Sequence, residues 1–314
     1  MSIRFQRVWN LSITRNDVEI LSLTSEVNTY RIAFECHPYA SLGAPSFISL
    51  EVYNLNQSQY SKLREGDSLT FSVGYKTQGQ GVIFSGQIYS FYGRDVATNQ
   101  SKDYIFSIYG LAYSTNGIET EPKVFSLPSG TILSQASVIS SFYGYKPSGK
   151  ISLKDPESAS SPSIHIVANN MDDAVMQFYR KTKYSIILDA KSKTYYLVSA
   201  QPTKEQRADI ARSSDGYPLI RVDDNTGMIG YPHADSMTGF VKVSFLIDPK
   251  VNIFSRLSID VSNAIIDNIN KTLSQKIVSN LRLYRDYYVI SLSIRGDTRS
   301  PVKSWYQEIL AIGL

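Results

Sequence analysis

The stretch GVIFSGQIYSFYGRD, residues 81–95, sets the geometry of the N-terminal third of the chain. Its hydrophobic and aromatic residues alternate with small or polar ones, and this period of two predicts a β-strand. Gly86 stands in the middle of it. A glycine inside a strand predicts a bend or bulge, here the place where a small barrel turns its corner.

The segments on either side repeat the alternation. In LTFSVGY, residues 69–75, the apolar residues fall at every second position, and YIFSIYGLAY, residues 104–113, alternates in the same way. Three such strands joined by short loops predict an antiparallel meander. Within the opening stretch we expect Val82, Phe84 and Ile88 on one face and Ile83, Tyr89 and Phe91 on the other. Apolar residues on both faces favour a sheet that curls and also packs outward.

Composition limits the classes of protein that need be considered. The chain has 314 residues, 42% of them hydrophobic and 19% charged, with a net charge of +4, which indicates a folded globular protein. The basic residues are scattered, which disfavours a dedicated nucleic-acid binder. Cys36 is the only cysteine, so an internal disulfide is impossible. The start lacks a signal-like apolar region and no apolar run reaches membrane-spanning length, so we expect a soluble protein without a membrane anchor, folded in a cytosol.

The middle third changes to helical spacing. SGTILSQASVISSFYGYK, residues 129–146, predicts a helix capped by Ser129 or Thr131 and stopped by Gly144. NNMDDAVMQFYRKTKY, residues 169–184, predicts a second helix. Asn170 would cap it, Asp172 and Asp173 would lie in its first turn, and Arg180, Lys181 and Lys183 in its last. YSIILDA and TYYLVSA then predict a hairpin around KSK, residues 191–193.

The last third returns to strand patterns. They lie in YPLIRV, GFVKVSFLI, RLSIDVS, YYVISLSIR and VKSWYQEILAI. Residues 262–280 fit either a long hairpin arm or a short helix. The fold class we predict is mostly β with an α+β middle unit. The predicted domains are an N-terminal β-barrel over residues 1–118, an α+β domain over 119–200 and a C-terminal β-barrel over 201–314.

No catalytic, cofactor or metal site is predicted. His37, His165 and His233 are far apart and match no metal-ligand spacing. Cys36 and His37 are adjacent on a strand, so their side chains point to opposite faces. A glycan or peptidoglycan hydrolase would need two carboxylates or a metal cluster in a cleft, and the sequence offers no such set.

Three short motifs have structural explanations. VDDNTG, residues 222–227, fails the spacing of a calcium loop and predicts a tight turn. The glycines of KTQGQGV, residues 76–82, do not open a helix and do not form a phosphate-binding motif. RGD, residues 295–297, ends a strong strand and predicts a turn there.

Two longer stretches together resemble a known family. LEVYNLNQSQYSKLREGDSLTFSVGY, residues 50–75, followed by VIFSGQIYSFYGR, residues 82–94, resembles the N-terminal barrel of bacteriophage tail baseplate hub proteins. The matching positions are Glu51, Tyr53, Asn54, Leu55, Gly66, Asp67, Gly74, Tyr75, Phe84, Ser85, Gly86 and Ile88.

The C-terminal third carries a second match to the same family. It lies in TGMIGYP, residues 226–232, then VSFLIDPKV, then YYVISLSIRGDTRSPVKSWYQEI. The matching positions are Gly227, Gly230, Pro232, Pro249, Gly296, Asp297, Thr298 and Trp305. Asp248 stands where many relatives have asparagine.

The resemblance implies a structural protein of the virion tail, assembled in the host cytoplasm. Hubs of this family are homotrimers with two β-barrel-like domains related by pseudo-symmetry, so three chains present six barrels and adapt a sixfold tail tube to a threefold spike or tip. The implied partners are the tail tube protein, the spike or tip protein and other baseplate proteins, with tape-measure protein and DNA passing through the lumen. The alternatives are a spike-base component of a type VI secretion-like machine and, in another class, a glycan hydrolase.

Overall fold

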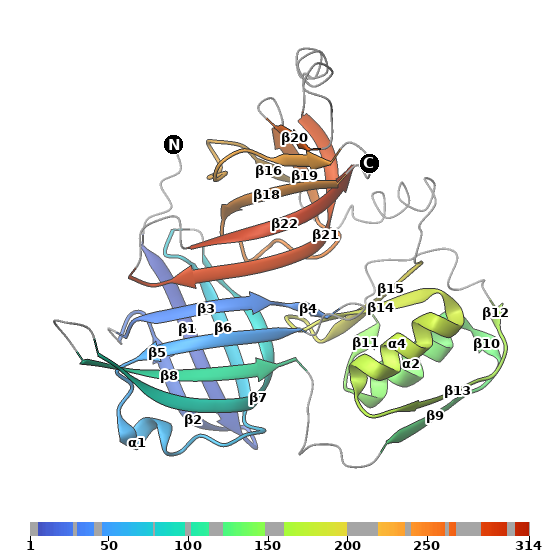
Figure 1. Ribbon diagram of the computed structural model, residues 1–314, viewed down its shortest axis with the longest axis horizontal. Helices are drawn as coiled ribbons and strands as arrows, with labels where there is room; N and C mark the ends of the chain where they lie inside the picture. Colours follow the sequence, from blue (N-terminus) through green and yellow to red (C-terminus); the bar gives the residue numbers. More distant parts are fainter. Residues whose placement is uncertain are drawn as a thin grey trace.

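The structure is a computed structural model that describes most of the chain in segments. The described residues are 6–27, 30–40, 46–77, 79–97, 102–112, 122–147, 160–199, 219–235, 240–260, 264–267, 284–299 and 305–313. They form two curved sheets and a separate α+β unit (Figure 1). The predicted fold class, mostly β with an α+β middle unit, is confirmed. Both predicted domain boundaries, at residues 118/119 and 200/201, lie outside the described residues.

The N-terminal sheet is antiparallel, in the order β2-β1-β6-β7-β8-β5-β3. The predicted meander is confirmed as the neighbours β6, β7 and β8. The short helix α1 (Gln57–Tyr60), capped by Asn56, connects β5 to β6. The strands are β1 (Arg7–Arg15), β2 (Val18–Thr24), β3 (Ile32–His37), β5 (Phe47–Tyr53), β6 (Ser68–Tyr75), β7 (Gly79–Ala97) and β8 (Lys102–Leu111).

The long strand β7 curls the N-terminal sheet because its two halves pair with different strands. Its first half, up to Gln87, pairs with β6, and its second half, from Gln87 onward, pairs with β8. Gly86 lies at this change of partner. A Cβ atom there would collide with the backbone carbonyl of Leu111 and lie 2.8 Å from Cε1 of Phe84. Glycine therefore allows the close approach of two backbones at the corner.

A β-bulge in β7 alters the expected faces. Phe71 pairs with Phe84 but the next residue of β6 pairs with Val82, so Ile83 is the extra residue. Ile83 and Phe84 are both fully buried, whereas Val82 is 37% exposed. The prediction that Val82 shares a buried face with Phe84 was wrong, because strict alternation does not hold across a bulge.

The C-terminal sheet is built on another long strand, β21 (Tyr284–Asp297). One edge of β21 pairs with β22 (Trp305–Gly313), followed by β18 (Phe240–Leu246), β17 (His233–Asp235) and β20 (Ile265–Asp267). Its other edge pairs first with β19 (Arg256–Asp260), which also carries β16 (Ile220–Val222). Of the ambiguous 262–280 region, Ile265–Asp267 is this strand β20, and most of the rest lies outside the described residues.

The two sheets are one hydrogen-bonded structure because β21 also pairs with β3. Beyond its contact with β19, the same edge of β21 pairs through Ile294–Asp297 with Ala33–Cys36. We call this pairing the seam. In Figure 1 the strand β21 runs directly beside β3 along the boundary between the two sheets.

The middle unit contains both predicted helices and the predicted hairpin. Helix α2 (Ile132–Phe142) is capped by Thr131, and helix α4 (Met171–Thr182) is capped by Asn170. Lys183 lies one residue beyond the last turn of α4, at the C-cap position with φ 64°. The strands are β9 (Lys123–Leu127), β10 (Gly130–Thr131), β11 (Lys146–Pro147), β12 (Ser160–Ser161), β13 (Ile164–Ala168), β14 (Tyr184–Asp189) and β15 (Thr194–Ser199). Within the described part of the chain, no helix is long and apolar enough to cross a membrane.

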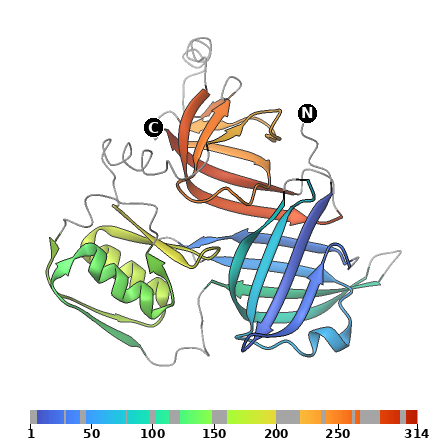
Figure 2. The ribbon, with the colours of Figure 1, turned by 180° about the vertical axis from the view of Figure 1, so that it is seen from behind.

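The middle unit is joined to the N-terminal sheet at one corner. The short strand β4 (Tyr39–Ala40) continues the line of β3 and pairs with β14 (Figure 2). Lys193, in the turn between β14 and β15, donates a hydrogen bond to the carbonyl of Ala112, which also accepts one from the Tyr145 hydroxyl at 3.1 Å. Burial lowers the pKa of Lys193 to about 8.

Replacing Gly86 by alanine should destabilise the N-terminal sheet. The added methyl group meets the Leu111 carbonyl, and we expect a loss of about 1–3 kcal/mol in the free energy of unfolding. Urea-induced unfolding of the wild type and the variant measures this loss. Gly130→Ala is the matched control, because its Cβ would meet only the Ser134 hydroxyl, at 3.1 Å. Equal stability of the two variants would contradict this account of the corner.

The position of Lys193 predicts a dependence on alkaline pH. The pKa falls from the ordinary 10.5 to about 8, so between these values the folded chain binds fewer protons than the unfolded one. Stability due to this group therefore rises with pH through that window, by about 1–3 kcal/mol. Thermal unfolding of the wild type and of Lys193→Met at pH 8 and 10.5 tests this. From pH 8 to pH 10.5 the wild type should gain stability relative to the variant. If the difference in stability between the two proteins is the same at both pH values, the effect is excluded.

Candidate functional site

The histidines and the cysteine do not form a reactive centre. His37 lies 3.2 Å from Glu35 Oε1 and stacks on Phe47, whereas His165 contacts Ser126 on another strand. Cys36 is fully buried, and burial raises the pKa of its thiol, which makes it a poor nucleophile. Among the residues that the structure describes, no three His, Cys, Asp or Glu side chains gather as metal ligands. The candidate functional features are therefore contacts and surfaces.

The apolar centre of the seam is an aromatic cluster around Gly296. Gly296 pairs with Phe34 on one side and with Trp305 on the other. The Phe34 and Trp305 rings meet edge to face at 5.3 Å, and Phe34 meets Phe71 in the same way at 5.0 Å. A Cβ atom on residue 296 would lie 2.6 Å from Cζ of Phe34 and 2.7 Å from Trp305. Glycine is required there so that the two rings can meet across the strand.

The polar side of the seam is anchored by Asp297. Its carboxylate accepts hydrogen bonds from Arg31, the shortest at 2.7 Å, and these raise the pKa of the guanidinium. Its backbone carbonyl accepts a hydrogen bond from Arg7 at 2.6 Å. Thr298 closes the seam, because its amide and hydroxyl pair with the carbonyl and amide of Ile32, each at 2.9 Å.

The RGD triplet is part of this seam. Arg295 donates to Glu35 at 2.7 Å across the strand pair. Burial alone would raise the pKa of Glu35, but the hydrogen bonds from His37 and Arg295 lower it overall. Both charged side chains of the triplet are thus engaged within the chain. As expected, the triplet ends a strand, since β21 stops at Asp297.

In the N-terminal sheet, Asn54 and Leu55 end strand β5. Asn54 adopts a left-handed conformation with φ 60° and exchanges hydrogen bonds with the backbone of Tyr104. Its amide also donates to Asp103 at 3.0 Å. Leu55 is buried beside it. The pair therefore turns the chain away from the sheet while holding the start of β8.

Gly66 and Asp67 fasten the loop before β6 to the corner of β7. The amide of Gly66, with φ +86°, donates to the carbonyl of Ile88 at 2.8 Å, and the Ile88 amide donates back to Asp67. The buried Asp67 carboxylate pairs with Arg15 at 2.7 Å and accepts the amide of Arg64. This motif therefore supports the same corner that Gly86 allows.

Gly74 and Tyr75 close the turn between β6 and β7. Gly74 pairs with Gln80, and a Cβ atom there would collide with the carbonyl of Gly79. Tyr75 is buried and pairs with Arg7 of β1. The close approach at this turn requires glycine for the same reason as at the corner.

The segment TGMIGYP lies along β18. Gly227, with φ +95°, accepts a hydrogen bond from Leu246 at 3.0 Å and has the Leu246 side chain against its Cα. Gly230 also has a positive φ, and the Pro232 carbonyl accepts from Ile265 of β20 at 2.8 Å. Just before them, Asp223 accepts the amides of residues 225 and 226, which confirms the predicted turn.

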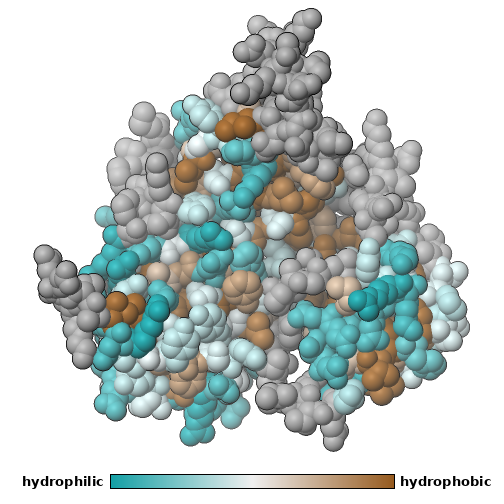
Figure 3. All heavy atoms as spheres, viewed as in Figure 1, coloured by the Kyte–Doolittle hydropathy of each residue, from teal (hydrophilic) through white to brown (hydrophobic). Residues whose placement is uncertain are grey.

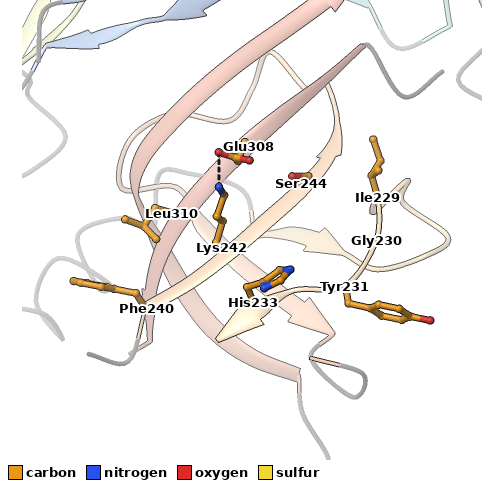
Figure 4. A pocket seen from close by; sticks show the side chains of 9 residues that line it. All are labelled: Ile229, Gly230, Tyr231, His233, Phe240, Lys242, Ser244, Glu308 and Leu310. Carbon is orange, nitrogen blue, oxygen red and sulfur yellow. Dashed lines mark ion pairs between the residues drawn. The ribbon is translucent and has the colours of Figure 1, made fainter. Parts of the chain in front are cut away.

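This segment forms one wall of an open groove of about 480 Å³ on the outer face of the C-terminal sheet. An ion pair between Lys242 of β18 and Glu308 of β22, at 3.0 Å, lies on its floor, and apolar side chains flank it (Figure 4). The lining residues are Ile229, Gly230, Tyr231, His233, Phe240, Lys242, Ser244, Glu308 and Leu310. The two charges of the floor are thus paired with each other.

Pro249 lies where the C-terminal sheet meets the N-terminal one. A Cβ atom on Gly81 of β7 would be 2.6 Å from the Pro249 ring, so the two residues are in close contact. The Pro249 carbonyl accepts a hydrogen bond from Lys191 of the middle unit. The contacts of Lys191, of Arg31 and of the Lys242–Glu308 pair were not predicted, because lysine and arginine in turns and on strands are usually solvated.

The motif residues thus gather in separate places. Gly296, Asp297 and Trp305 meet at the seam. Gly66, Asp67 and Gly86 meet at the corner of β7, whereas Gly227, Gly230 and Pro232 border the groove. Asn54, Leu55, Gly74, Tyr75 and Pro249 lie at other turns.

No protein-family model and no curated protein matches the sequence. The tail protein from Neisseria meningitidis MC58 superposes over 98% of this chain and 96% of its own, with 9% identity and a TM-score of 0.52. The Francisella PdpA–VgrG complex contains a chain that aligns with 98% of this one over 57% of its own, with 9% identity and a TM-score of 0.49. Prophage tail protein gp18 from Listeria monocytogenes EGD-e aligns with 98% of this chain over 94% of its own, with 9% identity and a TM-score of 0.38.

Of these three, the Neisseria protein has a TM-score above 0.5, and the assignment of fold rests on it. The alignment spans nearly all of both chains, which means that the shared feature is the whole arrangement and not one sheet. This chain therefore shares the fold of a solved tail protein.

Filling the space at Gly296 should weaken the seam. For Gly296→Ala we expect a loss of about 1–3 kcal/mol in the free energy of unfolding, because the methyl group overlaps Phe34 and Trp305. Phe34→Leu removes one of the overlapping rings, so the double variant should lose less than the sum of the two single losses. Chemical denaturation of the wild type, the two single variants and the double variant measures the coupling free energy between residues 34 and 296. Strict additivity would show that the two residues do not compete for the same space.

Proposed function

We propose that the chain is the structural hub of a bacteriophage tail baseplate, at the distal end of the tail. In this role it assembles as a homotrimer in the virion. The trimer joins the sixfold tail tube to a threefold spike or tip, contacts other baseplate proteins, and lines the channel for tape-measure protein and DNA. The proposal assigns no reaction and no cofactor to the chain.

The observation that carries the proposal is the full-length likeness to the Neisseria tail protein, because it includes both sheets and the middle unit. The resemblance of the motif residues to baseplate hubs supports it independently. Those residues lie at the corner of β7, at the seam and beside the groove, where they determine how the backbone bends and joins. That is the role expected of residues in a structural protein.

The seam supports the symmetry part of the proposal. A chain that mimics two neighbouring subunits of a sixfold ring must hold two similar sheets at a fixed angle. Backbone hydrogen bonds between β3 and β21 provide such a rigid connection, since they continue one sheet into the other. Three copies would then present six sheets around one axis.

Exposed apolar residues on both sheets support the formation of a ring. On the N-terminal sheet Tyr89 and Tyr92 are 52% and 47% exposed, and on the C-terminal sheet Tyr231 is 59% exposed. In the space-filling view, hydrophobic residues gather near the centre of the displayed face, over the C-terminal sheet (Figure 3). Apolar surface of this kind is common where subunits meet.

The oligomeric state of the purified protein tests the proposal. The chain has a mass of 35.2 kDa, and for the chain alone we expect particles of three times that mass in mass photometry. In particles that also contain the tail tube protein, we expect three copies of this chain. Electron microscopy of those particles should show threefold symmetry with a central channel. A strictly monomeric chain that is absent from purified virions would refute the proposal.

A further inference from the structure

The turn between β14 and β15 makes an unusual contact with the C-terminal sheet. The sequence KSK, residues 191–193, is typical of a solvated hairpin turn. In the structure the side chain of Lys191 instead enters the junction of the middle unit with both sheets, and its ammonium group meets the loop that follows β18.

The ammonium group of Lys191 is held by three oxygen atoms. It donates hydrogen bonds to the carbonyl of Pro249 at 3.1 Å, to the carbonyl of Val251 at 2.9 Å and to Oδ1 of Asn252 at 2.7 Å. A lysine ammonium has three N–H donors, so this set satisfies all of them. We call these three acceptors the oxygen cup.

The oxygen cup is shaped by its own loop. The Asp248 side chain accepts the amide of Lys250 at 3.0 Å, and the Asp248 carbonyl accepts that of Val251 at 3.1 Å. The amide of Asn252 donates to the buried Ser255 hydroxyl at 2.9 Å. These bonds do not involve Lys191, so the loop supports the cup through contacts of its own.

The N-terminal sheet contacts both partners of this interaction. The Tyr39 hydroxyl donates to Oδ1 of Asn252 at 3.1 Å, and the amide of Ala190, next to Lys191, donates to the carbonyl of Pro38 at 2.9 Å. Pro249 packs on Gly81. All three parts of the chain therefore meet around one ammonium group.

Two opposing effects act on the pKa of Lys191. Burial lowers the pKa of Lys191, while the nearby carboxylates of Asp189 and Asp248 and the thiol of Cys36 oppose this shift. Asp189 is itself buried and accepts the amide of Lys191 at 2.8 Å. A neutral amine has two N–H donors, so it would leave one of the three oxygens of the cup without a donor, which is costly in a buried site.

We propose that the loop 248–252 is a binding site for a primary ammonium group, that the chain fills it with its own Lys191, and that this contact is the latch that fixes the middle unit to the C-terminal sheet. The proposal goes beyond the role of a hub and does not depend on it. The middle unit has buried residues on α2, α4 and β13, among them Ile139, Phe178 and Ile166, and we expect these to keep it folded when the latch opens.

The distance between the middle unit and the C-terminal sheet tests the latch. Val167 of β13 and Tyr231, beside β18, are 54% and 59% exposed and accept spin labels after replacement by cysteine, whereas Cys36 is buried and stays unlabelled. In the full chain with Lys191→Ala, the distance distribution from pulsed electron resonance should broaden at least twofold. Lys250→Ala is the matched control, since Lys250 is an exposed lysine of the same loop, and it should leave the distribution unchanged.

Chemical rescue tests the site itself. n-Propylammonium replaces the atoms that Lys191→Ala removes, and at millimolar concentration it should restore the narrow distribution. Tetramethylammonium carries the same charge without an N–H donor and should not restore it. Rescue by both ions would overturn the proposed recognition, as would rescue by neither.

A second variant covers the case in which Lys191→Ala does not fold. Lys191→Gln keeps two donors and should broaden the distribution less than Lys191→Met, which keeps none. Circular dichroism establishes that each variant is folded. If Lys191→Met is folded and has the distribution of the wild type, the lysine is not a latch.

Discussion

The pairing of β3 with β21 is the constraint on which the rest of the structure depends. Strands from opposite ends of the chain meet there, and Gly296 lets Phe34 and Trp305 touch across the pair. Ion pairs from Arg31 to Asp297 and from Arg295 to Glu35 lie along the same strands. Hydrogen-bonded backbones allow little relative rotation, so the seam fixes the angle between the sheets. In the trimer that we propose, this rigidity would fix how each chain presents its two sheets.

Local patterns in the sequence were sufficient to predict helices, and strands whose pairing partners are close in sequence. The alternation in residues 69–75 predicted β6, and Asn170 with its following aspartates predicted the start of α4. The bulge at Ile83 could not be predicted, because it depends on the register of β7 against β6. The strands β1, β2 and β3 were not assigned individually, although Trp9, Leu11 and Ile13 of β1 alternate with polar residues. The pairing of β3 with β21 joins residues about 260 positions apart, and no local pattern encodes such a contact.

The motif residues of the hub resemblance have physical roles that explain why these residue types occur there. Gly86 and Gly296 allow close approaches of backbone or ring, and Gly227 and Gly230 adopt positive φ. Asp67 and Asp297 are charged groups whose partners lie on other strands. The sequence pointed to these positions but not to their partners. Lys191 and the Lys242–Glu308 pair were missed because isolated charged residues carry no pattern, and only the fold shows what they contact.

Cys36 lies on β3 directly opposite Ile294, inside the seam, and it is the only thiol of the chain. In the folded protein its sulfur is out of reach of solvent and points toward the backbone carbonyl of Ile83. A thiol reagent can therefore modify it only when the two sheets separate or the N-terminal sheet opens. The protein thus contains a built-in chemical reporter, and the rate of alkylation at this atom measures how often either of these openings occurs.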